Sequence, residues 1–168
     1  MKKQGFTLIE LMVVIVIMGI LAAVAVPKLF GMIAKSKASE VPTAAGTWIN
    51  LQDAFITEAN AAGDWNQIGY TGPGSRQNSG SYESENFAYY GDKSGNNGTW
   101  TAANKVKLNE CAIGGTWGLT ATANALNAQG QSSMTVTVAT DDGQGGLCVG
   151  LTPSFSTLAA NFQAPTTP

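Results

Sequence analysis

Glu10 is the only ionisable side chain among the 21 mostly apolar residues from Phe6 to Val26. As an α-helix this run would be about 31 Å long, which matches a bilayer core of about 30 Å. A carboxylate inside a membrane helix is costly unless it is paired, so Glu10 needs a functional partner. Lys2 and Lys3 precede the run. Because basic residues stay on the cytoplasmic side, we expect the rest of the chain to lie outside.

The composition argues against an enzyme. The chain has no histidine, which excludes Ser-His-Asp and Cys-His nucleophilic sites and histidine-ligated metals. It also carries no glycine-rich phosphate-binding motif. The net charge is −2, and loss of Lys2 and Lys3 would make it −4, so no basic surface for nucleic acid is indicated. We therefore expect no catalytic residue, no cofactor, no metal and no nucleic-acid partner.

Two cysteines, Cys111 and Cys148, lie in the part of the chain that is expected outside the membrane. An even cysteine count in an oxidising compartment indicates a disulfide. Closing a loop of 37 residues would stabilise the head by about 4 kcal/mol on the chain-entropy model. Two buried free thiols are the alternative.

The N-terminal residues resemble those of type IV prepilins. The resemblance is carried by a short basic leader that ends at Gly5, the segment Phe6-Thr7-Leu8-Ile9-Glu10-Leu11, and an apolar run interrupted by Gly19 and Pro27. It covers about the first thirty residues. The resemblance implies cleavage after Gly5 by a prepilin peptidase on the cytoplasmic face, methylation of the new amine of Phe6, and retention of the whole apolar helix.

The resemblance also implies a structural function. The protein would reside in the inner membrane as precursor and subunit pool, and the pilus assembly machinery would polymerise it into an extracellular type IV pilus. Such a filament is a helical homo-oligomer used for adhesion, motility or surface attachment. The Phe6 amine of one subunit could then reach the Glu10 carboxylate of its neighbour. Because an unpaired charge in apolar surroundings penalises other registers, we expect Glu10 and Phe6 to align the subunits.

Three alternatives stay open. A type II secretion pseudopilin would use a C-terminal acidic loop for calcium, for which Asp141-Asp142-Gly143 is the candidate, although Asp-Gly is also a common turn. A secreted sugar-binding module would use Ala23-Val24-Ala25 as a signal-peptide cleavage site, but a signal core normally has only about 7 to 15 apolar residues. A plain membrane anchor accounts for the hydropathy but not for Glu10.

The order of helical and strand patterns along the chain predicts an α+β fold, in which a long N-terminal helix packs on a small antiparallel sheet. We expect a leader at 1–5, a transmembrane and filament-core helix at 6–27, an amphipathic half of the helix at 28–63, a variable loop region at 64–104, and a sheet region with the disulfide and a loose tail at 105–168. Gly19, Pro27 and Pro42 are the expected kinks, since proline lacks an amide hydrogen and crowds the preceding turn.

The amphipathic half carries an apolar stripe at helical spacing, which consists of Trp48, Leu51, Phe55, Ile56, Ala59 and Ala62. Alternating side chains predict strands at 105–110, 116–122 and 134–139, with short strands at 147–151 and 86–90. We therefore expect three or four antiparallel strands, one face of which packs on the Trp48 stripe.

Four aromatic side chains in the glycine-rich region, those of Tyr82, Tyr89, Tyr90 and Trp100, have two interpretations. If they are exposed, they could stack on an external surface or polysaccharide, which would then be the adhesive partner of the head. If they are buried, they fill the core of a small domain.

Overall fold

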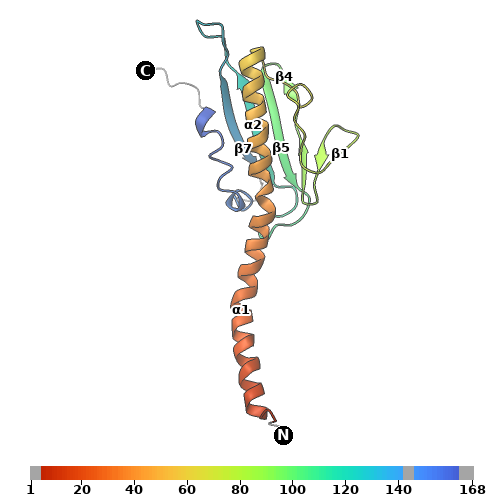
Figure 1. The fold of residues 1–168 in the computed structure, drawn as a ribbon, viewed down its shortest axis with the longest axis vertical. Coiled ribbons are helices and arrows are strands. Elements are labelled where there is room, and N and C mark those ends of the chain that lie inside the picture. The colour runs from red at the N-terminus through yellow and green to blue at the C-terminus, as the bar shows by residue number, and fades with distance from the viewer. Residues whose placement is uncertain (1–4, 142–145, 163–168) are drawn as a thin grey trace.

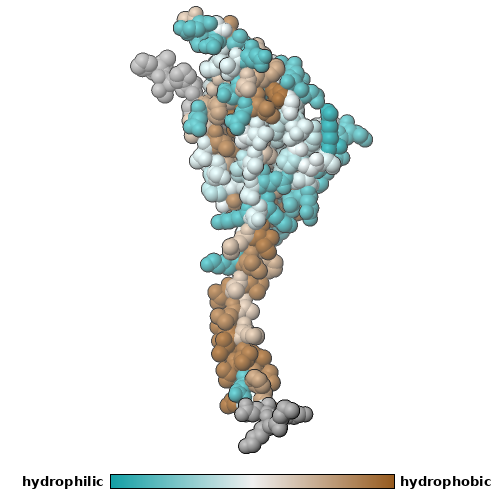
Figure 2. Space-filling model, viewed as in Figure 1, coloured by the Kyte–Doolittle hydropathy of each residue, from teal (hydrophilic) through white to brown (hydrophobic). Residues whose placement is uncertain are grey.

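The computed structural model, which describes residues 5–141 and 146–162, is a helical rod that carries a β-sheet head along its C-terminal half (Figure 1). Helix α1 spans Leu8–Ala38 and helix α2 spans Glu40–Ala59. The N-terminal part of α1 protrudes from the head, and Figure 2 shows that hydrophobic side chains cover it. The rod is long and apolar enough to cross a membrane.

The prolines lie within helical backbone. Pro27 is inside α1, as is Gly19, and Pro42 lies in the first turn of α2. The helical pattern is interrupted at Ser39, whose amide donates to the carbonyl oxygens of Lys35 and Lys37. We attribute the interruption to Pro42, which has no amide hydrogen to donate to Ala38. Bending at Gly19, Pro27 and Pro42 stays a prediction.

The head is built on an antiparallel sheet. Its strands are β1 (Ser75–Arg76), β2 (Tyr82–Glu83), β3 (Phe87–Tyr90), β4 (Lys93–Ser94), β5 (Asn97–Asn104), β6 (Thr116–Ala123) and β7 (Met134–Asp141). The order is β1-β2-β3-β5-β6-β7, and β4 pairs with β5. The three long strands β5, β6 and β7 are neighbours, with β7 at one edge of the sheet, in registers that pair Trp100 with Leu119 and Leu119 with Val138. The predicted α+β architecture is confirmed.

One face of this sheet is buried. Side chains alternate along β5 and β6, so that Trp100, Trp117 and Leu119 point into the core while the neighbouring threonines, such as Thr101 and Thr120, are half-exposed. Helix α2 covers this face with Val41, Ala44, Ala45, Trp48, Ile49, Gln52 and Ile56. From the predicted stripe, Trp48, Ile56 and Ala62 are buried, Leu51 and Phe55 are half-buried, and Ala59 is exposed.

Gln52 is a polar residue in the middle of this apolar face, and it is fully buried. Its Nε2 donates to the carbonyl oxygen of Gly63 at 2.8 Å, and its Oε1 accepts the Gly63 amide at 3.1 Å. Both polar atoms are therefore satisfied, as burial requires. The pair fixes the chain after α2, which ends where Asn60 adopts a left-handed conformation with φ 54°.

A disulfide between Cys111 and Cys148 joins the β5–β6 connection to the C-terminal segment. This segment contains the 3₁₀ helices η1 (Val149–Leu151) and η2 (Ala160–Phe162). Helix η1 contacts α1 and η2 contacts β7 (Figure 1). Phe155 is buried with its ring 6.2 Å from that of Trp100, and Thr152 Oγ1 accepts the indole N–H of Trp117 at 2.8 Å. The disulfide prediction is confirmed.

Two predicted strands are wrong. The alternating segment 105–110 turns back at Asn109, whose φ is 55°, and Leu108 pairs only with Cys111 across that turn. The segment 147–151 forms turns and η1, because the chain reverses at Gly146, whose φ is 89°, and Gly150 donates back to the Gly146 carbonyl at 3.2 Å. Neither segment runs extended as the sequence predicted.

The region 64–104 was expected to be a variable loop with one short strand. It contains β1 to β5, and β5 is a central strand of the sheet. The sheet therefore begins earlier in the chain than the predicted boundary at 105. The expected leader residues 1–4 and the tail 163–168 lie outside the described residues.

Candidate processing and assembly site

The predicted cleavage junction lies at the end of the rod. Gly5 and Phe6 precede α1 without helical structure, and the Phe6 side chain is 80% exposed. A Cβ atom added to Gly5 would meet no heavy atom within 4 Å. The folded chain thus offers this peptide bond openly, and nothing in the described residues requires glycine at position 5 for packing.

Thr7 and Glu10 form a capping box at the start of α1. The Thr7 backbone N–H donates to Glu10 Oε2 at 2.9 Å, and the Glu10 backbone N–H donates to Thr7 Oγ1 at 3.4 Å. The Thr7 hydroxyl also donates to Glu10 Oε2 at 2.7 Å. Such a box satisfies amide groups that the first turn of a helix otherwise leaves unpaired.

This role of Glu10 and Thr7 was missed in the sequence, although the signal was present. The pattern Thr-x-x-Glu before an apolar run is the signature of a capping box. The box explains why a single subunit tolerates the carboxylate at this position. Within the described residues no donor contacts Glu10 Oε1, so this oxygen can accept a donor from outside the subunit.

The predicted pair Phe6 and Glu10 therefore lies together at one end of α1, with Glu10 on the first helical turn. The arrangement within one subunit leaves the pairing between subunits as a prediction. After cleavage, Phe6 would carry a positively charged ammonium group. The Glu10 carboxylate of a neighbouring subunit would supply the complementary negative charge.

From its first turn onward, α1 presents an apolar surface that no other part of the described chain covers. In the described chain the large apolar side chains of α1 are each 44 to 77% exposed, and they include Leu8, Ile9, Leu11, Ile15, Met18, Ile20, Leu21, Val24 and Leu29. Contiguous apolar surface of this extent marks contact with a membrane or with other protein chains.

A groove lies where this surface meets the head. It has a volume of about 710 Å³ and is lined by Val26, Pro27, Phe30, Ile33, Lys37, Lys107 and Leu108, among others. Its floor is apolar and its lysines are cationic, which suits the boundary between acyl chains and polar head groups. This position agrees with a membrane span that ends near Pro27.

The aromatic residues of the head divide between core and surface. Tyr89 and Trp100 are fully buried, so of the two interpretations packing in the core holds for them, and stacking on an external ligand does not. Tyr89 donates to Glu40 Oε1 at 2.6 Å, and the Trp100 indole N–H donates to the Tyr70 hydroxyl at 2.9 Å. They are drawn inward because β3 and β5 present alternate side chains to α2. Tyr90, the next residue on β3, is 45% exposed.

Among the described residues, no group of three or more His, Cys, Asp or Glu side chains is arranged to hold a metal ion. The acidic loop considered as a calcium site includes Asp142 and Gly143, which lie outside the described residues.

Comparison with known proteins gives an N-terminal match and several relatives. Residues 1–26 match the family model described as the prokaryotic N-terminal methylation motif. The type IV major pilin protein PilA of Myxococcus xanthus is 43% identical over 70 residues, which is 41% of this chain and 32% of the relative. A type IV major fimbrial protein FimA of Dichelobacter nodosus is 41% identical over 70 residues, which is 42% of this chain and 44% of the relative.

The fimbrial protein EcpC of Eikenella corrodens is 54% identical over 44 residues, which is 26% of this chain and 29% of the relative. The chain thus matches less than half the length of each of these three relatives. No solved structure matches. The matched motif contains Gly5, Phe6 and Glu10, the residues gathered at the end of α1.

Proposed function

We propose that this chain is a type IV pilin, a structural subunit that polymerises through α1 into an extracellular filament. The observation that carries the proposal is the exposed apolar surface of α1, which begins directly after the Gly5-Phe6 junction of the N-terminal methylation motif. A soluble monomer could not keep this surface in water, because its burial is strongly favoured. Lipid covers it before assembly, and neighbouring helices cover it in the filament.

The order of events follows from this arrangement. The precursor sits in the inner membrane, and a prepilin peptidase cuts after Gly5 on the cytoplasmic face and methylates Phe6. The pilus assembly machinery then moves α1 out of the bilayer into a helical bundle. The heads form the outer surface of the filament, where they are the part available to an external surface or polysaccharide.

A type II secretion pseudopilin is the second candidate. The three relatives named above are pilin or fimbrial proteins, which favours the surface filament. These relatives are structural proteins by name, and we assign the chain no catalytic role.

The experiment that tests the proposal is to shear filaments from cells that make this protein and to determine the mass of their main subunit. We expect a mature chain that begins at N-methylated Phe6. A mature chain that begins at Val26, or a filament fraction that lacks the protein, would refute the proposal.

Gly5→Leu tests the cleavage step separately. Because a side chain at position 5 meets open space in the folded chain, the substitution should leave the fold unchanged and should block only the close approach of the peptidase to the backbone. We expect full-length precursor to accumulate in the membrane, as measured by immunoblot. Gly31→Leu is the matched control, since position 31 on α1 is equally open, and it should be cleaved normally.

A further inference from the structure

A pocket of about 560 Å³ opens on the side of the head, far along the chain from the assembly site. Its walls come from the segment that follows α2, from the hairpin between β1 and β2, and from the end of β3. This volume lies within the range of small-molecule sites in proteins. The pocket combines aromatic side chains with a small number of polar groups.

Four aromatic side chains line the pocket with different exposure, and one of them, Tyr70, is only 3% exposed and meets the Trp65 ring edge-on. Trp65 is 7% exposed, Tyr82 is half-buried and Tyr90 is 45% exposed. The Trp65 indole N–H already donates to the Thr99 carbonyl at 3.2 Å, so its ring offers the pocket an apolar surface. The rings of Trp65 and Tyr82 have centroids 6.0 Å apart and planes inclined by only 30°. The planes of these two rings are therefore closer to parallel than to perpendicular.

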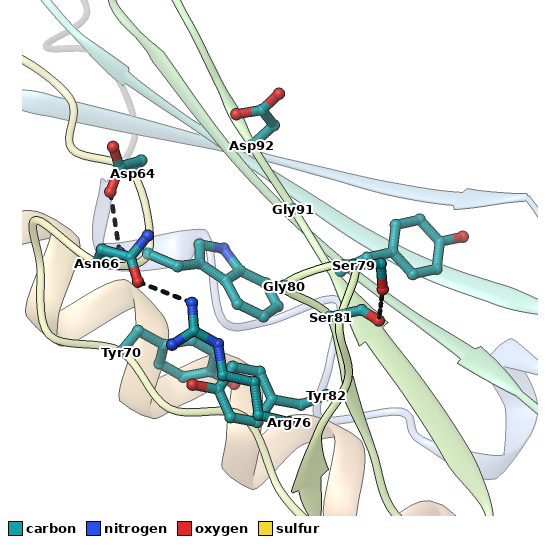
Figure 3. A pocket seen from close by; sticks show the side chains of 12 residues that line it. Asp64, Asn66, Tyr70, Arg76, Ser79, Gly80, Ser81, Tyr82, Gly91 and Asp92 are labelled. Atoms are coloured by element: carbon teal, nitrogen blue, oxygen red, sulfur yellow. Dashed lines mark hydrogen bonds between the residues drawn. The ribbon is translucent and has the colours of Figure 1, made fainter.

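The polar groups are held in place before any ligand arrives. Asp64 Oδ1 accepts the amides of Asn66 and Gln67 at 2.9 and 2.8 Å, and Asp92 Oδ1 accepts the amide of Lys93 at 2.7 Å. Arg76 donates to Asn66 Oδ1 at 3.2 Å, and Figure 3 shows its guanidinium group reaching across the pocket towards Asn66. The pocket therefore contains both acceptors and donors on fixed supports.

Gly91 keeps this site open at the end of β3. A Cβ atom there would overlap the Thr99 carbonyl and would lie 2.6 Å from Trp65 Nε1. Glycine thus allows the backbone of β3 to approach Trp65 and leaves the adjoining wall without a side chain.

We propose that this pocket binds a neutral glycan built from β-linked glucose or N-acetylglucosamine. A pyranose whose substituents are all equatorial presents flat faces of C–H groups, which pack on aromatic rings, and a rim of hydroxyl groups. Carboxylates and amides accept hydrogen bonds from those hydroxyls, and a guanidinium group donates to them. The aromatic rings available for packing against the sugar faces are those of Trp65, Tyr82 and Tyr90. The groups available for hydrogen bonds to the hydroxyls are those of Asp64, Asp92 and Arg76.

A cationic ligand is the competing class, because aromatic rings and carboxylates also hold ammonium groups. Two observations favour the glycan. Arg76 places a positive charge among the residues that line the pocket, where it repels a cation. The planes of Trp65 and Tyr82 are inclined by only 30°, whereas a cation cage turns the faces of its rings towards one central point. The two carboxylates in turn disfavour an anionic glycan.

This proposal deepens the proposed function, because a glycan site on the head would be the contact through which a filament holds a surface. Its test uses the full chain dispersed in detergent micelles, so failure to bind is distinguishable from failure to assemble. Cellohexaose and chitohexaose are titrated by calorimetry and by saturation-transfer NMR. We expect at least one of them to bind with a Kd on the order of 1 mM, with saturation transferred to the sugar C–H groups.

Tyr90→Ala should weaken this binding about tenfold, because it removes one stacking surface. Leu126→Ala is the matched control, since Leu126 is 59% exposed and lies in the connection between β6 and β7; it should bind as the unaltered chain does. Ser79→Trp places a large side chain on the wall of the pocket that the β1–β2 hairpin forms. Because Ser79 is exposed, the substitution removes no core contact, and it should abolish binding by filling the pocket. Circular dichroism confirms that each variant is folded.

No binding of either oligosaccharide at 10 mM would overturn the proposal, as would equal binding by the Tyr90→Ala, Ser79→Trp and unaltered chains. Binding of tetramethylammonium without binding of either sugar would assign the pocket to the cationic class instead. Cells that make the Tyr90→Ala protein should still form filaments, which separates this site from assembly.

Discussion

Glu10 illustrates how one side chain can act within a subunit and between subunits. Its carboxylate closes a capping box with Thr7 at the start of α1. The same carboxylate lies close to the position of the amine that cleavage would create on Phe6. An ionised pair between neighbouring helices would add little net stability but would penalise incorrect registers. The capping and alignment roles make different demands on the side chain, so they can be separated by substitution.

Glu10→Gln separates them, because glutamine can also complete a capping box but carries no charge. If the charge aligns subunits, the Glu10→Gln protein should be processed after Gly5, should remain in the membrane and should form few or no filaments, as counted by electron microscopy of sheared pili. Glu10→Leu, which loses both roles, should fail in the same way.

Thr7→Ala is the matched control, because it weakens the cap and keeps the charge. We expect filaments from this variant. Normal filaments from Glu10→Gln as the sole subunit, together with their loss in Thr7→Ala, would show that capping and not charge is what assembly requires.

At the scale of the elements, the disulfide and α2 hold different parts of the head. Helix α2 covers the central strands, while the bond between Cys111 and Cys148 attaches the C-terminal segment over the same sheet. Both sulfur atoms belong to fully buried residues. Thr152 and Phe155, which contact Trp117 and Trp100, follow closely in the chain, so the bond also keeps these contacts in place.

Reduction should therefore destabilise the head. The bond closes 37 residues, which corresponds to about 4 kcal/mol and to a fall in Tm of roughly 10–20 °C. The measurement is thermal unfolding of the full chain in detergent micelles, followed by near-ultraviolet circular dichroism, with and without phosphine reductant. The double variant Cys111→Ala and Cys148→Ala is the control, and its Tm should not respond to reductant. An equal Tm for the reduced and oxidised chains would contradict the prediction.

At the scale of the whole molecule, two buried tyrosines connect the rod to the sheet. Tyr70 donates to the Ala44 carbonyl of α2 at 3.3 Å, and Tyr89 of β3 donates to Glu40 Oε1 at 2.6 Å. Burial raises the pKa of the Tyr70 phenol from 10.0 to about 12. Burial, followed by the hydrogen bond to Glu40, raises the pKa of Tyr89 further above its ordinary value.

These shifts predict that the head loses stability in alkali. Above about pH 10 the unfolded chain releases the phenol protons while the folded chain retains them, so the free energy of unfolding falls as the pH rises. Tyr70 alone should account for a loss of about 2 kcal/mol between pH 10 and pH 12, and Tyr89 should add to it. The measurement is denaturant unfolding of the full chain in detergent micelles between pH 8 and pH 12.

Tyr70→Phe and Tyr89→Phe should each make the decline with pH shallower, whatever their effect at pH 8. Tyr90→Phe alters an exposed phenol on the same strand as Tyr89 and serves as the matched control. If the free energy of unfolding fell with pH at the same slope in Tyr70→Phe, Tyr89→Phe and the unaltered chain, the assignment of this pH dependence to the two buried phenols would be contradicted.

The sequence by itself determined the elements whose patterns are local. A run of 21 apolar or small residues with one carboxylate predicts the protruding helix, because a helix of that composition and length needs no tertiary partner to be recognised. Alternation along 116–122 and 134–139 predicted β6 and β7, which the structure shows at Thr116–Ala123 and Met134–Asp141. The pairing of two cysteines followed from their number and expected compartment.

Only the tertiary structure decided which patterns become strands and which aromatic side chains face solvent. β5 has a glycine at position 98 because a Cβ there would overlap buried Gln52, and such a contact between distant segments leaves no local signal. The alternating segment 105–110 is no strand, since the chain turns at Asn109. Tyr89 and Tyr90 are adjacent in sequence, yet one is buried and the other exposed, because the pleat of β3 sends neighbours to opposite faces and only the position of α2 selects the buried one.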